Sequence, residues 1–155
     1  MTELIQTISI PAHINRCWHL ALHPYLPYLA SSSSDQTVNI YDTVSNTLIT
    51  TLKGNHSRSI RASNWKPSRQ PVLATASFDG SVGIWRPEDE DGEESGDWEC
   101  VAQLEGHENE CKCVAWSFDG QYLGTCSRDK SVWVWEGSIP LAAVTDECSA
   151  RRRRV

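Results

Sequence analysis

The sequence predicts an all-β protein built from three similar units, and three observations support this fold class. First, one ten-residue sequence motif occurs three times, as one clear copy and two weaker copies. Second, the copies recur at a nearly regular spacing. Third, each copy ends in alternating apolar residues, the period of two that is typical of a β-strand. The copies read SSDQTVNIYD at 33–42, SFDGSVGIWR at 77–86 and SRDKSVWVWE at 127–136.

The spacing of the copies indicates the size of the repeating unit. Measured between Asp35, Asp79 and Asp129, the intervals are 44 and 50 residues, and the longer interval contains an acidic insertion. A period of about 40 to 45 residues is typical of a four-stranded propeller blade rather than of a helical repeat. We therefore expect an open, partial β-propeller with about three blades.

Strands are expected where small and β-branched residues alternate between turn signals. The first unit predicts strands at 17–22, 28–34, 37–42 and 47–52, and the second predicts strands at 60–65, 72–78, 81–85 and 98–104. The third predicts strands at 111–117, 121–127 and 131–136, without a convincing fourth strand. The expected organisation is a strand at 1–10 that would complete the last blade of a ring, blade 1 at 11–54, blade 2 at 55–106 with an acidic loop at 87–97, an incomplete blade 3 at 107–137, and a divergent, disordered tail at 138–155.

Four residue types keep their register through the three units. A histidine precedes each aspartate by 22 or 23 residues, a serine precedes it by two, and an aromatic residue follows it by six. The sets are His13, Ser33, Asp35 and Tyr41; His56, Ser77, Asp79 and Trp85; and His107, Ser127, Asp129 and Trp135.

These sets could be interpreted as a hydrolytic Ser-His-Asp site, but a structural network fits them better. A catalytic centre needs one nucleophile, whereas the set occurs three times, each time with an aromatic partner. We expect the serine to bridge the histidine and the aromatic ring while the aspartate orients the histidine. The first unit should be the weakest, because Tyr41 stands where the others have tryptophan. No catalytic residue is expected, since no glycine-rich phosphate loop occurs either.

The net charge of -6 comes from one short segment. Residues 87–97 carry seven acidic residues, and without them the balance is -6 + 7 = +1. Such a run is typical of a solvated, mobile loop, and a dedicated basic partner is the alternative. Nucleic-acid binding is not indicated.

The six cysteines do not form a metal-binding or disulfide pattern. No Cys-x-x-Cys pair occurs, and no histidine stands at zinc-finger spacing from the close pair Cys111 and Cys113. We expect buried free thiols, with Cys111 and Cys113 on one face of a strand. No metal or cofactor is predicted.

Targeting signals are not apparent in the sequence. The N-terminus lacks a basic region followed by an apolar stretch, and no run of about 18 apolar residues occurs, so neither secretion nor a membrane span is indicated. We expect a cytoplasmic or nuclear protein. The four arginines at 151–154 could mimic a nuclear or phosphate-binding signal, but we interpret them as part of a tail that has lost the repeat pattern.

With these positions in register, residues 1–137 resemble the WD-repeat family of β-propellers. The dipeptide that names the family is replaced by YD, WR and WE in the three units. Three longer segments are similar to the WD-repeat subunits of the cytosolic iron-sulfur protein assembly machinery. They are LEGHENECKCVAWSFDGQYLGTCSRDKSVWVWE at 104–136, RCWHLALHP at 16–24 and ATASFDGSVGIW at 74–85. This chain resembles such a subunit truncated after about three of its seven blades.

The resemblance implies a non-enzymatic adaptor that holds no cluster itself. Its implied partners are a HEAT-repeat adaptor, a small targeting subunit, an iron-only-hydrogenase-like cluster carrier, and cytosolic and nuclear apoproteins. Two other hypotheses remain open at this point: a scaffold of some other multiprotein complex, and a truncated product without function.

The resemblance also implies where partners would bind. In such a blade the residue four after the histidine (Cys17, Ile60, Cys111) is expected to be buried, and its neighbours point outward at the narrow end of the ring. The residue before each aspartate is expected to open onto the same rim. Because arginine and aromatic residues are common interface anchors, the predicted partner-binding residues are Arg16, Trp18, Arg61, Phe78, Lys112 and Arg128.

Overall fold

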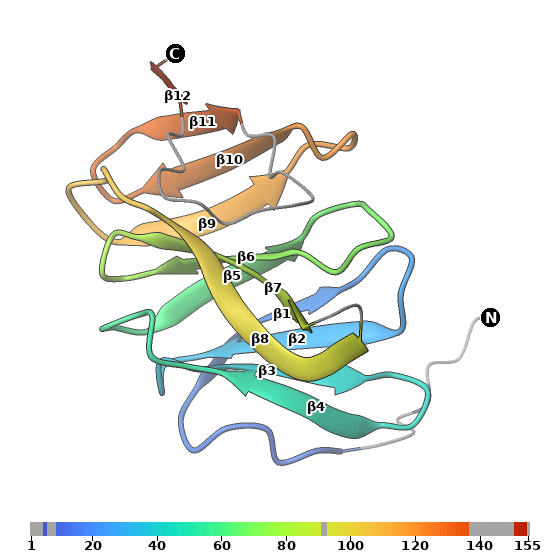
Figure 1. The fold of residues 1–155 in the computed structure, drawn as a ribbon. Helices are drawn as coiled ribbons and strands as arrows, with labels where there is room; N and C mark the ends of the chain where they lie inside the picture. Colours follow the sequence, from blue (N-terminus) through green and yellow to red (C-terminus); the bar gives the residue numbers. More distant parts are fainter. Residues whose placement is uncertain (1–4, 6–8, 91–92, 137–150, 155) are drawn as a thin grey trace.

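In the computed structural model the chain forms three four-stranded antiparallel sheets that stack one upon the next (Figure 1). The structure describes residues 5, 9–90, 93–136 and 151–154. The prediction of an all-β, blade-like fold is confirmed, and the stack is not closed into a ring. No helix in this described part of the chain is long and apolar enough to cross a membrane.

Each sheet is a meander whose strands follow one another in chain order. The first sheet contains β1 (Cys17–Leu22), β2 (Tyr28–Ser33), β3 (Val38–Asp42) and β4 (Thr47–Leu52). The second contains β5 (Ile60–Trp65), β6 (Leu73–Ser77), β7 (Val82–Glu90) and β8 (Glu93–Leu104). The third contains β9 (Cys111–Trp116), β10 (Tyr122–Ser127), β11 (Val132–Glu136) and β12 (Arg151–Arg154).

The turn between the second and third strands of each sheet is built around the repeated aspartate. In the second sheet the Asp79 carboxylate accepts the backbone N–H of Ser81 at 2.9 Å. The residue between them, Gly80, has a φ of 90°, which glycine adopts without steric cost. Gln36 and Lys130 take the same left-handed conformation in the other two turns. The side chain of the aspartate thus stabilises the hairpin that the sequence pattern predicts.

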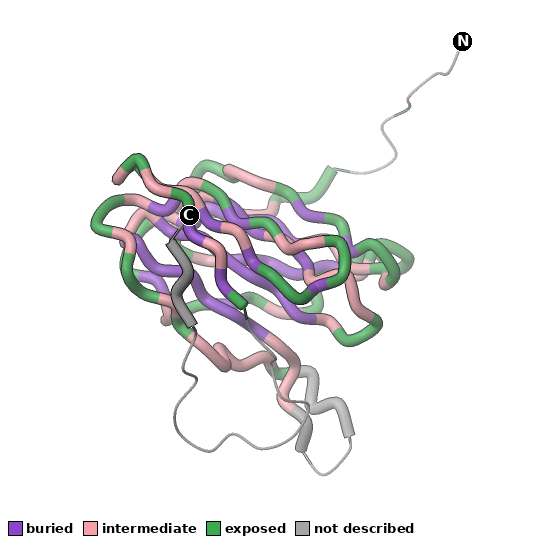
Figure 2. Tube along the Cα trace, turned by 90° about the horizontal axis from the view of Figure 1, so that it is seen from above, coloured by how far each residue is buried: buried purple, intermediate pink, exposed green. Residues whose placement is uncertain are grey.

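The core lies between the sheets, and Figure 2 shows the buried residues along the middle of the strands. One apolar cluster joins the first sheet to the second, where Val38 and Ile40 pack with Trp65 and Trp85. A second cluster joins the second sheet to the third, where Val82 and Ile84 pack with residues that include Trp135. Each interface therefore pairs the Val-x-Ile face of one sheet with the tryptophan-bearing face of the next.

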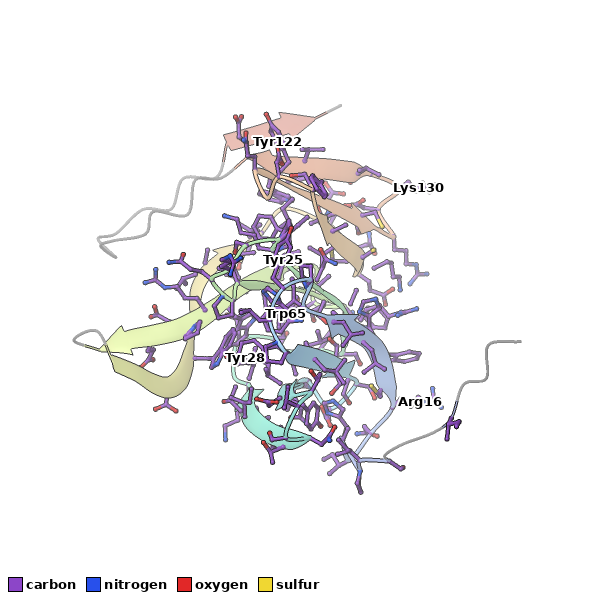
Figure 3. All side chains as sticks on the ribbon, turned by 90° about the vertical axis from the view of Figure 1, so that its right-hand side faces the viewer. Arg16, Tyr25, Tyr28, Trp65, Tyr122 and Lys130 are labelled. Carbon is purple, nitrogen blue, oxygen red and sulfur yellow. The ribbon has the colours of Figure 1, made fainter. Side chains whose placement is uncertain are left out.

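An aromatic group packs between the first two sheets at one end of the strands. The Trp65 ring lies 5.1 Å from His23, 6.1 Å from Tyr28 and 5.9 Å from Trp98, measured between ring centroids. Its indole N–H donates to the carbonyl of Ala21 at 2.9 Å. In Figure 3 Tyr25, Tyr28 and Trp65 lie toward one side of the stack, whereas Arg16 and Lys130 lie at the other. The aromatic group therefore stabilises the first two sheets at the ends of the strands that lie away from the repeated aspartate turns.

The third sheet has a fourth strand, which the sequence analysis did not predict. β12 pairs antiparallel with β11, from Trp133 opposite Arg154 to Glu136 opposite Arg151. The expectation of disorder was therefore wrong for residues 151–154, while residues 137–150 lie outside the described part. An edge strand is held by backbone hydrogen bonds, which a run of arginines can form without apolar alternation.

The acidic segment 87–97 is also more regular than expected. β7 and β8 continue pairing through it, with Pro87 opposite Trp98 and Glu90 opposite Glu93. The expectation of a loop was therefore wrong for residues 87–90 and 93–97, because a backbone ladder can extend beyond the apolar part of a sheet, while residues 91 and 92 lie outside the described part. The expected strand at 1–10 lies mostly outside the described residues, and Ile5, Ser9 and Ile10 belong to no strand.

Candidate functional site

The second sheet contains the complete form of the repeated polar network. The Nδ1 atom of His56 lies 3.2 Å from a carboxylate oxygen of Asp79 and 3.1 Å from the Ser81 hydroxyl. Its Nε2 atom lies 2.8 Å from the hydroxyl of Thr75, which accepts the indole N–H of Trp85 at 2.9 Å. When Nδ1 of His56 carries the proton, every hydrogen bond in this network has a donor and an acceptor. The network links β6 and β7 to the segment before β5.

The bridging hydroxyl differs from the sequence-based assignment. Thr75 bridges histidine and tryptophan in the second sheet, and Thr125 does so in the third, at 2.9 Å from His107 and 3.0 Å from Trp135. The predicted bridging role of Ser33, Ser77 and Ser127 was therefore wrong. Each of these serines instead accepts the backbone N–H of its aspartate, at 3.1 Å for Asp35 and 3.2 Å for Asp79 and Asp129.

The first sheet carries an incomplete version of the network. His13 contacts Asp35 at 3.1 Å and the Ser31 hydroxyl at 2.8 Å. The Tyr41 hydroxyl, however, accepts a hydrogen bond from the Asn39 side chain at 3.1 Å. Sequence analysis missed Ser31, Thr75 and Thr125, although a hydroxyl residue four before each aspartate was a regular signal. It also missed the hydroxyl two after each aspartate, in Thr37, Ser81 and Ser131.

The aspartates are set up as fixed hydrogen-bond acceptors. Burial by itself would raise the pKa of Asp79, but hydrogen bonds from His56 and Ser81 outweigh it and hold the pKa well below its usual range. The same opposition lowers the pKa of Asp129, where burial is outweighed by hydrogen bonds from Ser131 and His107. The carboxylates therefore remain ionised at neutral pH and orient the histidines.

The start of each sheet has the same local geometry at the predicted rim. The residue before each aspartate donates its backbone N–H to the residue three after the histidine. The three bonds are Ser34 to Arg16 at 2.9 Å, Phe78 to Ser59 at 2.9 Å and Arg128 to Glu110 at 3.0 Å. A register shift follows at the second residue of β1, β5 and β9, so that Trp18, Arg61 and Lys112 lie at a β-bulge.

These bulges bring cations and aromatic rings from neighbouring sheets together. The Arg61 guanidinium lies 5.3 Å from the ring centroid of Trp18, and the Lys112 ammonium lies 4.0 Å from that of Phe78. The Trp18 and Phe78 rings are themselves 6.4 Å apart. Four of the predicted residues thus form one row across three sheets, which we call the rim row: Trp18, Arg61, Phe78 and Lys112.

One carboxylate organises the basic end of the rim row. Glu110 lies 2.6 Å from the Lys112 ammonium, 3.4 Å from Arg58 and 3.7 Å from Arg128. The hydrogen bond from Lys112 is the main cause that lowers the pKa of Glu110. Three cations share one carboxylate, so the surface around it has an excess of positive charge. Arg58, which also donates to the Phe78 carbonyl at 2.8 Å, was missed by sequence analysis.

Two other rim expectations need correction or qualification. Arg16 is exposed, and its described contribution is its backbone carbonyl rather than a side-chain contact with the rim row. Cys17, which was expected to be buried, is exposed, whereas Ile60 and Cys111 are buried. The difference arises because β5 and β9 lie on a preceding sheet, whereas β1 does not.

Among the five cysteines that the structure describes, Cys111 alone is the buried free thiol that was expected, and Cys148 lies outside the described residues. Cys111 is buried, and desolvation raises its pKa to about 12, whereas Cys17 and Cys113 are exposed. Cys111 and Cys113 do not share a face, because the bulge at Lys112 interrupts the alternation between them. Across the described ranges, no group of three or more histidine, cysteine, aspartate or glutamate side chains could hold a metal ion.

Comparison with known proteins connects this geometry to a family. Residues 3–42, 46–86 and 98–136 match the family described as WD domain, G-beta repeat. A probable cytosolic Fe-S cluster assembly factor of Schizosaccharomyces japonicus is 52% identical over 134 residues, covering 86% of this chain and 21% of that protein. The corresponding protein of Schizosaccharomyces pombe is 52% identical over 136 residues, covering 88% of this chain and 21% of that protein.

A further relative carries a similar name. A probable cytosolic iron-sulfur protein assembly protein of Emericella nidulans is 42% identical over 151 residues, covering 81% of this chain and 34% of that protein. The chain therefore spans about a fifth to a third of the length of these relatives. The resemblance found in the sequence is confirmed by these names.

Proposed function

Because the chain belongs to the WD-repeat family (WD domain, G-beta repeat), we propose that it is a non-catalytic adaptor in cytosolic iron-sulfur cluster assembly. The rim row, together with Arg58, Glu110 and Arg128, would be its partner-binding surface. The names of the relatives support the process, and the geometry of the rim supports the kind of activity. We expect the protein to act in the cytoplasm, and in the nucleus where it serves nuclear apoproteins.

The observation that carries the proposal is the concentration of interface-forming side chains at the rim. Arg128 and Arg58 are largely exposed, yet both are positioned by the Glu110 carboxylate. Arginine and aromatic side chains account for much of the binding energy in protein interfaces, and pre-positioning them lowers the entropy lost on binding. The polar networks below the rim hold the turns that carry Phe78 and Arg128. In this proposal they support the binding surface.

The proposed partners are those that the resemblance implies. They are the HEAT-repeat adaptor, the small targeting subunit, the iron-only-hydrogenase-like carrier and the apoproteins that receive clusters. In this proposal the cluster is cargo held by a partner. The excess positive charge around Glu110 would favour a partner surface that carries carboxylates.

A binding assay with purified partners tests the proposal. We expect the chain to bind the HEAT-repeat adaptor or the small targeting subunit, and Arg128→Glu to weaken binding about tenfold or more. Arg69→Glu is the matched control, because Arg69 is exposed between β5 and β6, at the other end of the strands. Both variants should melt within a few degrees of the wild type, since each changes one exposed side chain.

Two results would contradict the proposal at different points. Equal binding by Arg128→Glu and wild type would remove Arg128 from the binding surface. Failure of the wild-type chain to bind either subunit would overturn the assembly-adaptor function and favour a scaffold of another complex or a product without function.

A further inference from the structure

Glu110 lies at the seam between the second and third sheets and contacts cations from both. Its carboxylate is 2.6 Å from the Lys112 ammonium, 3.4 Å from the Arg58 guanidinium and 3.7 Å from the Arg128 guanidinium. Arg58 comes from the segment before β5, whereas Lys112 is the second residue of β9. The hydrogen bond from Lys112 lowers the pKa of Glu110, so the carboxylate is ionised at neutral pH. One negative charge therefore faces three positive charges.

The three ion pairs of Glu110 are not equally close. The Lys112 ammonium donates a short hydrogen bond to the carboxylate, at 2.6 Å. The contacts of Arg58 and Arg128 are longer than a typical hydrogen bond. These two side chains are 56% and 69% exposed, whereas Glu110 is 17% exposed. Because a guanidinium has several N–H donors in a planar fork, both arginines keep donors that a second anion can reach from solvent.

Phe78 holds two of the three cations independently of Glu110. Arg58 donates to the Phe78 carbonyl at 2.8 Å, and the Lys112 ammonium lies 4.0 Å from the centroid of the Phe78 ring. The backbone N–H of Phe78 is in turn bonded to the Ser59 carbonyl at 2.9 Å. Neutralising Glu110 should therefore leave Arg58 and Lys112 close to their present positions.

We propose, resting on the function proposed above, that Glu110 competes with a partner's carboxylate for Arg58 and Arg128. A partner carboxylate that binds these two guanidinium groups comes close to the Glu110 oxygens, which lie within 3.4 and 3.7 Å of the same groups. Two carboxylates at such a separation repel each other. Glu110 thus lowers the affinity of the surface for a single acidic side chain, and it favours partners that present several carboxylates.

Glu110 has a second, opposite effect, because it also restrains the arginines before binding. Such restraint lowers the entropy that is lost when a partner binds. The restraint is weak for Arg128, whose contact is 3.7 Å long, and it is shared with the Phe78 carbonyl for Arg58. The repulsion acts at a separation well below the Debye length, so salt screens it only in part. Competition therefore outweighs restraint, which predicts that neutralising Glu110 tightens binding.

Fluorescence anisotropy with a fluorescein-labelled octaglutamate peptide tests this prediction on the 155-residue chain. We expect Glu110→Gln to lower the dissociation constant about five- to tenfold, because the amide keeps an acceptor for Lys112 but not the negative charge. Glu99→Gln is the matched control, since it removes the same charge from an ion pair with Arg86 at 3.1 Å, outside the rim row. The control should stay within about twofold of the wild type.

A second variant and a second probe assign the gain to the arginines and to carboxylates. Arg58→Gln, added to Glu110→Gln, should remove most of the gain, because it deletes one of the two guanidinium groups. Octaglutamine should not bind, and the gain should shrink as the salt concentration rises. Tighter binding of an oligodeoxythymidylate than of octaglutamate by the wild type would assign the surface to phosphate and overturn the carboxylate proposal.

The sign of the change separates competition from a structural role of Glu110. Weaker or unchanged binding of octaglutamate by Glu110→Gln, in a variant that melts like the wild type, would overturn the proposal. Absence of binding by both proteins would also overturn it. The test needs no assembly subunit, so it can fail separately from the proposed function. A chain that binds no subunit but shows the gain would retain the competition and lose the adaptor function.

Discussion

The first and second sheets show how one repeated pattern gives two different polar networks. In the second sheet Thr75 connects His56 to Trp85, so that histidine, hydroxyl and indole form one chain of hydrogen bonds. In the first sheet Ser31 bonds to His13, but Tyr41 bonds to Asn39 instead. The same spacing of residue types therefore does not ensure the same connections.

The first and second sheets also differ in the residue that lies four positions after the aspartate. Gly83 occupies this position in the second sheet, and a Cβ there would lie 2.9 Å from the Trp85 indole nitrogen and 2.8 Å from the Asn55 side chain. In the first sheet the position is Asn39, which bonds to the Ala12 carbonyl and the Tyr41 hydroxyl. In both sheets the residue four positions after the aspartate therefore lies close to the residue directly before the histidine.

The largest difference between the sheets is expected on removing the bridging hydroxyl. Thr75→Val leaves both the His56 Nε2 and the Trp85 indole without their partner, so we expect a loss of about 3 kcal/mol in the free energy of unfolding. Ser31→Ala affects His13 but not Tyr41 and should cost about 1 kcal/mol. Urea denaturation of both variants measures the difference. Equal losses would show that the Trp85 bond contributes little.

A smaller effect is expected from filling the space at Gly83. Gly83→Ala places a methyl group against Asn55, Trp85 and Thr75, which should cost about 1 to 3 kcal/mol by overpacking. Gly124→Ala is the matched control in β10, where the nearest atom to the added Cβ is the Ala115 carbonyl oxygen at 3.7 Å. Thermal unfolding should separate the two variants. A Gly83→Ala variant as stable as Gly124→Ala would mean that the network yields easily.

The repeated aspartates should make the free energy of unfolding depend on pH. The pKa of Asp79 is lowered in the folded state, so the unfolded chain takes up a proton near the ordinary value of 3.8 while the folded chain does not. The stabilisation is therefore present above that value and is lost as the pH falls below it toward the folded-state pKa. Denaturation at neutral pH and near pH 3 should show a weaker decline for Asp79→Asn than for wild type. Parallel declines would assign the acid sensitivity to other carboxyl groups.

The smallest expected effect is a gain in the first sheet. The double change Asn39→Gly with Tyr41→Trp copies the second sheet and should let the indole reach Ser31, with a gain of at most about 1 kcal/mol. Tyr41→Trp alone should not be stabilising, because Asn39 still occupies the space and loses its hydroxyl partner. A double-mutant cycle on urea denaturation gives the coupling energy. Additive effects would show that the two positions are independent.

The local order of this protein could be predicted from the sequence. Alternating residues such as Val82 and Ile84, with the turn at Asp79, are enough to predict a hairpin, because the side-chain period and the turn chemistry act over a few residues. The expected strands agree closely with β1 to β6 and β9 to β11. The sequence also predicted that Asp79 bonds to His56, since the spacing recurs in every unit. The partner-binding role of Arg128 stays a prediction.

Only the tertiary structure decided which groups meet at longer range. Thr75 and Ser77 lie on the same face of β6, so the alternation could not distinguish them, and the depth of the His56 ring along the strand selects Thr75. Cys17 and Cys111 occupy equivalent positions, yet one is exposed and the other buried, because burial depends on whether a preceding sheet is present. Sequence patterns determine the direction of a side chain along its own strand, but its contacts depend on the neighbouring sheet that packs against it.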